Sequence, residues 1–149
     1  MRNFKKVLSL VLCMAMMLSV MVMGTGATSL GDYTDKDQVN DKYAVAVAVV
    51  TQLGILEGVG KDTFAPQMNL SRAQMATMIY RMYTGDVDKE YVANFVDGAK
   101  KFTDTPVDAW YAGYVGYAAD AAFLKGCGDG TYQPGADLTG YAAAAVLLR

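Results

Sequence analysis

The chain of 149 residues contains no histidine, only two cysteines and a single tryptophan. Without histidine, Ser-His-Asp and Cys-His catalysis are excluded, and so is a histidine-based metal site. Serine is scarce as well, because only Ser29 and Ser71 lie beyond residue 27. Paired carboxylates stay formally open with 15 acidic residues, but most of these fall in expected loops and caps. The composition therefore disfavours an enzyme, and we expect no catalytic residue, no metal site and no cofactor.

The longest apolar run lies at the N-terminus. Arg2, Lys5 and Lys6 precede apolar residues 7–23, and small residues follow at 24–27. This order is typical of a secretory signal peptide, so we predict a leader at 1–27 that is cleaved near Ala27. An uncleaved membrane anchor is the alternative, because about 17 apolar residues approach the minimum that spans a bilayer. Contact with a membrane is expected only through this segment.

Beyond the leader, acidic residues outnumber basic ones. Removal of the leader lowers the number of basic residues from 13 to 10 and leaves all 15 acids, so the net charge is about −5. A nucleic-acid partner is not expected, because it would require a basic face. Cys127 is the remaining thiol, which excludes an intrachain disulfide in the mature chain. We expect this thiol to be buried, with pairing between chains as the alternative.

The mature chain consists of two related units. Tyr33-Thr34-Asp35 recurs 69 residues later as Phe102-Thr103-Asp104. The other matches share a spacing of 68: Tyr43 with Tyr111, Leu56 with Leu124, Gly58 with Gly126, Phe64 with Tyr132, Pro66 with Pro134, Leu70 with Leu138, and Ser71 with Thr139. So many matches at one period indicate an internal repeat. We predict one repeat at 33–85, a linker helix within 86–101, and a second repeat at 102–149.

Each repeat is expected to be helical, which makes the predicted fold all-α. Residues 43–50 alternate as in a strand, but the matching residues 111–121 do not, and both copies place apolar residues at helical intervals. We therefore predict helices at 43–53 and 111–121. Aspartates 35 or 37, and 104 or 108, are candidate caps, with solvated loop acids as the alternative.

A second helix is predicted from Ser71 to about Tyr83, ending near Gly85. Ser71 and Gln74 form a capping box, which satisfies two backbone amides. Arg72 lies in the first turn, beside amides that favour an anion. The apolar bend at 55–56 is expected to fill the core, and Gly98 is expected to end the linker helix.

These motifs resemble the S-layer homology repeat. They are the aromatic-Thr-Asp entry, Leu-Gly-Ile-Leu-x-Gly at 53–58, the glycine turn followed by Thr-aromatic-x-Pro, and Leu-Ser-Arg-Ala-Gln at 70–74. The second copy adds Trp110-Tyr111-Ala112 and a Gly-Asp-Gly turn at 128–130. The two copies that carry the resemblance together cover nearly the whole mature chain. It implies repeats packed as part of a pseudo-trimeric helical arrangement.

The resemblance also implies a function and a site. Grooves between such repeats bind secondary cell wall polysaccharide, often pyruvylated, or a peptidoglycan-linked glycan, and so hold secreted proteins on the surface of Gram-positive-type envelopes. Arginine can meet a pyruvyl carboxylate with two parallel hydrogen bonds, and sugar rings stack on aromatic faces. The candidate glycan-binding residues are Ser71, Arg72, Gln74, Trp110, Gly128, Asp129 and Thr139.

Some residues depart from the family pattern. Gly140 replaces the arginine in the second copy, residues 59–62 lack the full glycine turn, and two repeats are present where the family usually has three. These departures leave two alternatives open. One is a structural or self-assembling envelope protein whose repeats no longer bind glycan. The other is the N-terminal fragment of a larger surface protein.

Overall fold

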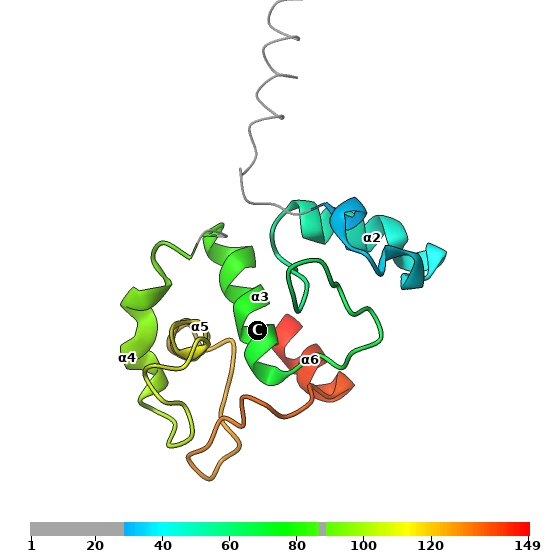
Figure 1. The fold of residues 1–149 in the computed structure, drawn as a ribbon. Helices are drawn as coiled ribbons and strands as arrows, with labels where there is room; N and C mark the ends of the chain where they lie inside the picture. The colour runs from blue at the N-terminus through cyan, green and yellow to red at the C-terminus, as the bar shows by residue number, and fades with distance from the viewer. Residues whose placement is uncertain (1–28, 87–88) are drawn as a thin grey trace, which may run out of the picture.

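The computed structural model describes residues 29–86 and 89–149 (Figure 1). The predicted leader at 1–27 lies outside the described residues. In chain order, with η marking a 3-10 helix, the elements are η1 (Leu30–Asp32), η2 (Lys36–Gln38), α2 (Asp41–Gln52), α3 (Arg72–Thr84), η3 (Val92–Phe95), α4 (Val96–Ala99), α5 (Ala112–Asp120) and α6 (Gly140–Leu147). No strand occurs in this part of the chain, which confirms the all-α prediction. The same residues hold no helix of the length and apolarity that a membrane crossing needs.

The second helix of repeat 1, α3, begins at the predicted capping box. Ser71 Oγ accepts the amide of Gln74 at 3.2 Å, and Gln74 Oε1 accepts the amide of Ser71 at 2.7 Å. The helix ends at Gly85, whose φ of 69° is the left-handed conformation that glycine adopts at a C-terminal cap. Its counterpart α6 has only one of the two capping-box bonds. Thr139 Oγ accepts the amide of Ala142 at 3.2 Å, but the alanine side chain cannot accept the amide of Thr139. The second helices of both repeats thus begin at equivalent N-cap residues, and the helix of the second copy is capped more weakly.

The aromatic-Thr-Asp motif clamps the loop of its own repeat. Asp35 accepts the amides of Phe64 and Ala65 at 2.8 and 2.7 Å, and Asp104 accepts the amides 28 and 29 residues further on, both at 2.7 Å. The helix α2 is capped instead by Asn40. Asp35 occupies the N-cap position of η2 but makes no side-chain capping bond. The carboxylates of Asp35 and Asp104 bond long-range loop amides instead, so the predicted capping by these two side chains is wrong.

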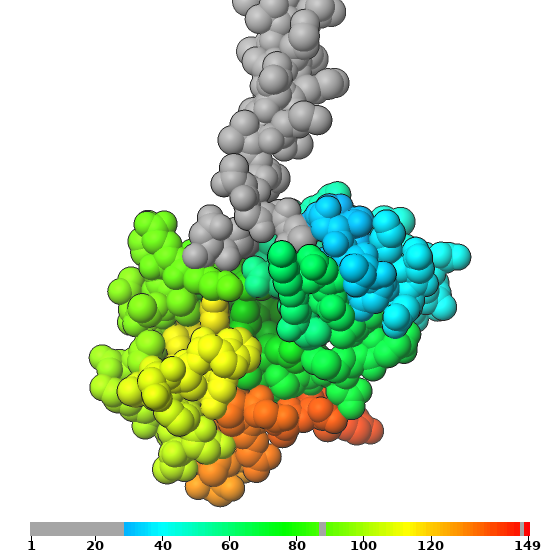
Figure 2. All heavy atoms as spheres, in the orientation of Figure 1, coloured from blue at the N-terminus to red at the C-terminus, as the bar shows by residue number. Residues whose placement is uncertain are grey.

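The main hydrophobic core is shared between the two repeats. It is formed by Met75, Ala76, Ile79 and Tyr80 of α3 together with Tyr114, Val115, Ala118, Leu124, Tyr132 and Val146 of repeat 2. The ring of Tyr80 meets those of Tyr114 and Tyr117 edge-on, with centroids 5.3 and 5.2 Å apart. Among the described helices α2 contacts η1 alone, and Figure 2 shows its segment to one side of the molecule. The second helix of repeat 1 is thus built into repeat 2.

The linker contains two short helices, η3 and α4, where we predicted one. Both pack along α5. A Cβ on Gly98 would lie 2.6 Å from the carbonyl oxygen of Gly116, and one on Gly116 would lie 1.8 Å from that of Phe95. Gly98 therefore allows α4 to approach α5 closely, and it does not end the linker helix as predicted.

Two further expectations are corrected by the fold. Ile55 and Leu56 are half-buried and line a hollow, whereas their counterpart Leu124 is buried in the core, so the bend fills the core in repeat 2 only. Cys127 is exposed, because it lies in the glycine-rich turn and not under a helix.

Candidate functional site

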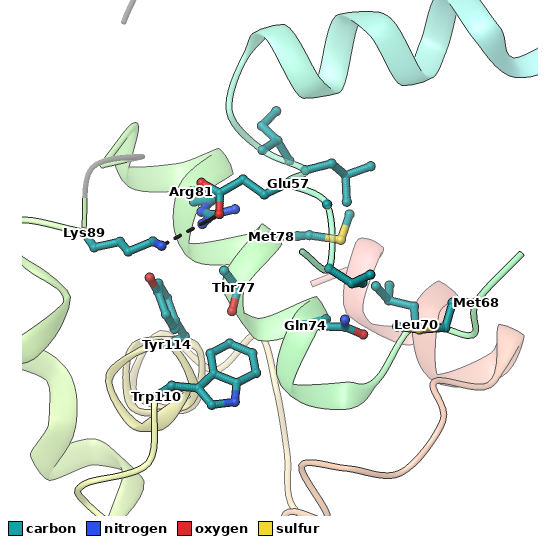
Figure 3. Close-up of a pocket in the computed structure, with 14 residues that line it drawn as sticks. Glu57, Met68, Leu70, Gln74, Thr77, Met78, Arg81, Lys89, Trp110 and Tyr114 are labelled. Atoms are coloured by element: carbon teal, nitrogen blue, oxygen red, sulfur yellow. Dashed lines mark ion pairs between the residues drawn. The ribbon is translucent and has the colours of Figure 1, made fainter. Parts of the chain in front are cut away.

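Each repeat forms a hollow between its bend and its second helix. In repeat 1 this hollow has a volume of about 360 Å³ and lies between residues 55–59, α3 and the start of α5 (Figure 3). In repeat 2 a hollow of about 160 Å³ lies between residues 124–126, Tyr132 and α6, with Arg72 of repeat 1 in its wall. We call them the Trp110 hollow and the Arg72 hollow. Both are built from segments of the two repeats, so both depend on the packing of α3 against repeat 2.

Trp110 forms an exposed wall of the Trp110 hollow. Its side chain is 63% exposed, and its ring lies edge-on to that of Tyr111 with centroids 5.4 Å apart. Tyr114, one turn further along α5, is buried in the same wall, and desolvation raises the pKa of its phenol. From α3, Gln74 lines the hollow, and its Oε1 is already engaged in the capping box. An exposed indole beside a partly polar hollow is a surface that can hold a flat, amphipathic ligand.

Two basic side chains and one acidic side chain form an ion-pair cluster in the Trp110 hollow, which leaves one net positive charge there. Arg81 Nη2 lies 2.8 Å from Glu57 Oε2, and Lys89 Nζ lies 3.8 Å from the same oxygen (Figure 3). The Arg81 side chain is only 5% exposed, and its Nε is buried without a hydrogen-bond partner among the described residues. A buried charge requires a counter-ion, so Glu57 is the group that stabilises the Arg81 guanidinium.

Arg72 joins the two repeats and carries charge into the Arg72 hollow. Its Nε donates to the carbonyl oxygen of Tyr132 at 2.7 Å and its Nη2 to that of Lys125 at 3.1 Å. The guanidinium carbon lies 4.7 Å from the centre of the Tyr132 ring, in a cation–π arrangement. Lys125 and Arg149 line the same hollow, and no acidic residue is among the residues lining it. This hollow is therefore cationic.

The first turn of α3 is closed to a ligand. The amides of Arg72 and Ala73 donate to the carbonyl oxygens of Ala136 and Pro134, both at 3.0 Å, and the amide of Gln74 donates to Ser71 Oγ. We expected these amides to favour an anion, but the loop of repeat 2 occupies them. An anion near Arg72 would have to be held by side chains.

The predicted site residues are distributed over separate places. Gln74 and Trp110 line one hollow, and Arg72 lines the other. Asp129 Oδ1 accepts the hydroxyl and the amide of Thr131 at 2.6 and 2.9 Å, and these bonds lower the pKa of the Asp129 carboxyl. The remaining predicted residues line neither hollow: Ser71, Gly128, Asp129 and Thr139.

Sequence reasoning missed Arg81 and Glu57. A signal for Arg81 was present, because Arg149 lies 68 residues further on and lines the Arg72 hollow just as Arg81 lines the Trp110 hollow. Glu57 gave no such signal, because its counterpart Lys125 carries the opposite charge.

Comparison with known proteins places the chain. A family model described as the S-layer homology domain matches residues 32–76 and 101–144, more than half of the chain and once in each repeat. The chain belongs to the S-layer homology domain family. This family consists of typically non-catalytic modules, which agrees with the exclusion of histidine-dependent catalysis above.

Relatives of this S-layer homology protein are surface proteins. A "Cell surface protein" of Thermoanaerobacter kivui is 34% identical over 100% of this chain and 19% of its own length. A "Surface layer protein" of Brevibacillus choshinensis is 28% identical over 97% of this chain and 12% of its own length. A "Middle cell wall protein" of Brevibacillus brevis is 26% identical over 97% and 13%. The chain thus spans less than a fifth of the length of these relatives, and no solved structure matches it. These relatives are named as proteins of the cell surface, the surface layer and the cell wall.

Proposed function

We propose that this protein is a non-catalytic anchoring module that binds a cell-envelope glycan through its repeats. The glycan is a secondary cell wall polysaccharide or a peptidoglycan-linked polymer, and the protein is held at the surface of a Gram-positive-type cell. The observation that carries the proposal is the Trp110 hollow, where an indole 63% exposed stands beside a space of about 360 Å³. This volume lies in the range that holds one small ligand such as a pyranose ring.

The Arg72 hollow supports the same proposal. Three cationic side chains line it, and a polymer bearing carboxylates, such as pyruvylated sugar, offers the matching charge. Two of the guanidinium donors of Arg72 are already bonded to backbone carbonyls, so Lys125 and Arg149 share the contact with the anion.

Sedimentation with purified wall sacculi tests the proposal. The wild-type protein is expected to pellet with polysaccharide-bearing sacculi and to stay in solution with sacculi stripped of that polymer. Trp110→Ala should reduce pelleting several-fold while leaving the fold intact, because the side chain is largely exposed. Lys125→Gln should reduce it too, and added salt should weaken the remaining charge-led contact. Equal pelleting with intact and stripped sacculi would refute glycan binding.

Self-association is the second candidate function. The observation that favours it is the apolar surface of α2, where Val45 and Val49 are 77% and 48% exposed although α2 is a helix of a folded repeat. Large exposed apolar patches commonly mark protein contacts. Light scattering that reports a dimer or larger species, lost in Val45→Lys, would support an assembly role, and a monomer at all concentrations would oppose it.

A further inference from the structure

A third hollow lies where repeat 1 meets the linker. Its volume is about 420 Å³, which is within the range of sites that hold small ligands. The walls come from the last turn of α3, from the loop that follows this helix, and from η3, and they include Tyr80, Asp86, Glu90, Tyr91 and Phe95. We call it the acidic hollow. It shares no lining residue with the Trp110 hollow or the Arg72 hollow, so it is a separate place on the molecule.

Both charged side chains of the acidic hollow are carboxylates. Asp86 accepts the amides of Glu90 and Tyr91, both at 2.9 Å, and the hydroxyl of Tyr80. Desolvation by itself would raise the pKa of Asp86, but the hydrogen bonds that it accepts lower this pKa, so the carboxylate is ionised at neutral pH. Glu90 is exposed and takes part in none of the ion pairs among the described residues. No basic residue is among the described residues that line the hollow, which therefore holds two negative charges.

The basic residues next to these acids in the chain are engaged elsewhere. Lys89 precedes Glu90, but its Nζ lies 3.8 Å from Glu57 in the Trp110 hollow. Arg81 follows Tyr80, and its guanidinium lies 2.8 Å from the same Glu57 carboxylate. The last turn of α3 adds to the negative potential of the acidic hollow, because the C-terminal carbonyls of a helix carry a partial negative charge. Adjacent residues thus place positive charge in one hollow and negative charge in the other.

Aromatic rings form the apolar part of the acidic hollow. Tyr80 is fully buried and Phe95 is half-buried, and their rings meet edge-on with centroids 5.9 Å apart. Tyr91 is 55% exposed, so its ring is accessible to a ligand. A cation is attracted to the face of an aromatic ring, most strongly where water is partly excluded. Carboxylates and aromatic rings in one hollow are therefore suited to an organic cation.

We propose that the acidic hollow binds a primary ammonium group carried by a sugar or by an amino acid. The ammonium donates to the exposed Glu90 carboxylate and to Asp86 Oδ1, which accepts one hydrogen bond from the described residues and has a second lone pair. The ring of Tyr91 packs on the carbon atoms beside the charge. A primary ammonium suits the hollow better than a quaternary one, because it has N–H groups for the carboxylates. This site adds to the proposed anchoring module and depends on neither of the other hollows.

Two matched pairs of probes test the proposal, and acetylation removes the positive charge in each pair. Glucosamine and N-acetylglucosamine represent the sugar source. Nα-acetyl-lysine methylamide and its Nε-acetylated form represent the amino-acid source. Each probe is titrated into the ¹⁵N-labelled purified protein at about pH 6, where the amines are protonated and the carboxylates are ionised. The charged member of at least one pair should shift the amides of Gly85, Glu90 and Tyr91 to saturation, and its acetylated form should bind at least about fivefold more weakly. The pair whose charged member binds more tightly identifies the source of the ammonium.

Three variants test which groups hold the ammonium. Glu90→Gln should lower the affinity for the charged probe on the order of tenfold, because it removes one carboxylate charge from a partly solvated site. Its side chain is exposed, so the fold should remain intact. Tyr91→Leu keeps an apolar side chain without a ring and should lower the affinity about two- to fivefold. Asp108→Asn is the matched control, because it removes one negative charge from an exposed side chain outside the hollow and should leave the affinity unchanged.

The outcomes separate this inference from the proposed function. Equal affinity for the charged and acetylated members of both pairs would overturn the ammonium site, and so would an unchanged affinity in Glu90→Gln. An equal loss in Asp108→Asn would also overturn it, because the effect would then come from net charge and not from the hollow. If the wild-type protein pellets with sacculi although neither charged probe binds, the ammonium site is refuted and glycan binding stands. If a charged probe binds but the protein does not pellet, the ammonium site stands and the anchoring function is refuted.

Discussion

Replacement of Arg72 by alanine should destabilise the whole domain, because this side chain joins the two repeats. The change removes two hydrogen bonds from a charged donor, at 2.7 and 3.1 Å, and a cation–π contact at 4.7 Å. Bonds of this kind contribute about 1.5–3 kcal/mol each, and the ring contact about 0.5–1 kcal/mol. The carbonyl of exposed Lys125 can turn to water, whereas that of buried Tyr132 has less access to it. We expect the free energy of unfolding to fall by about 2–4 kcal/mol.

Equilibrium unfolding in urea measures this loss. With a slope of roughly 1.3 kcal/mol per molar urea for a domain of this size, a loss of 3 kcal/mol lowers the midpoint by about 2 M. Arg72→Lys is the matched control, because it keeps the charge but lacks the planar group that bonds both carbonyls and stacks on the ring. It should recover less than half of the difference. A midpoint for Arg72→Ala within about 0.3 M of the wild type would refute the role of Arg72 in joining the repeats.

Three further predictions follow from local geometry. Gly116→Ala should lower the urea midpoint strongly, because its Cβ would lie 1.8 Å from the Phe95 carbonyl oxygen. Gly140→Ala should instead raise the free energy of unfolding by about 0.5–1 kcal/mol, because its Cβ would meet no neighbour and alanine has the higher helix propensity. Hydrogen bonds from the amide of Phe64, and then from that of Ala65, lower the pKa of Asp35. The ionised carboxylate therefore stabilises the fold fully above the unfolded pKa near 3.8, and this stabilisation is lost as the pH falls below that value. Asp35→Asn should lower the urea midpoint at pH 7 and should make the decrease of the midpoint toward pH 3 less steep. Cys127 should react with a thiol reagent in the folded protein at a rate close to that of a free thiol, and Cys127→Ser should abolish this fast phase.

The local parts of the fold were predictable because their causes lie within a few residues. Ser71 and Gln74 are three positions apart, and the bonds between them require only the helix that they start. The same holds for the helical character of residues 43–53, where the second copy resolved an ambiguous pattern. The repeat with its spacing of 68 residues was also visible, because residue identities alone reveal it and no knowledge of contacts is needed.

The hydrogen-bond partners of the polar groups that recur in both repeats were not predictable in this way. Asp35 seemed suited to cap a nearby helix, but its oxygens bond amides 29 and 30 residues away. The shared core around Tyr80 depends likewise on how α3 packs against repeat 2. Periodicity identifies equivalent residues, but it does not say which repeat they pack against.

The same limit applies to the site. Sequence comparison of the two copies pointed to Arg72 and Gly140, the positions where the arginine motif changes. In the folded chain Arg72 donates two hydrogen bonds to carbonyl oxygens 53 and 60 residues away, and Lys125 and Arg149 also line the hollow beside it. The substitution that most changes the chemistry of a hollow is therefore Glu57 against Lys125, which lies outside the arginine motif. A repeat that retains its packing residues can change its ligand through the few side chains that packing leaves free.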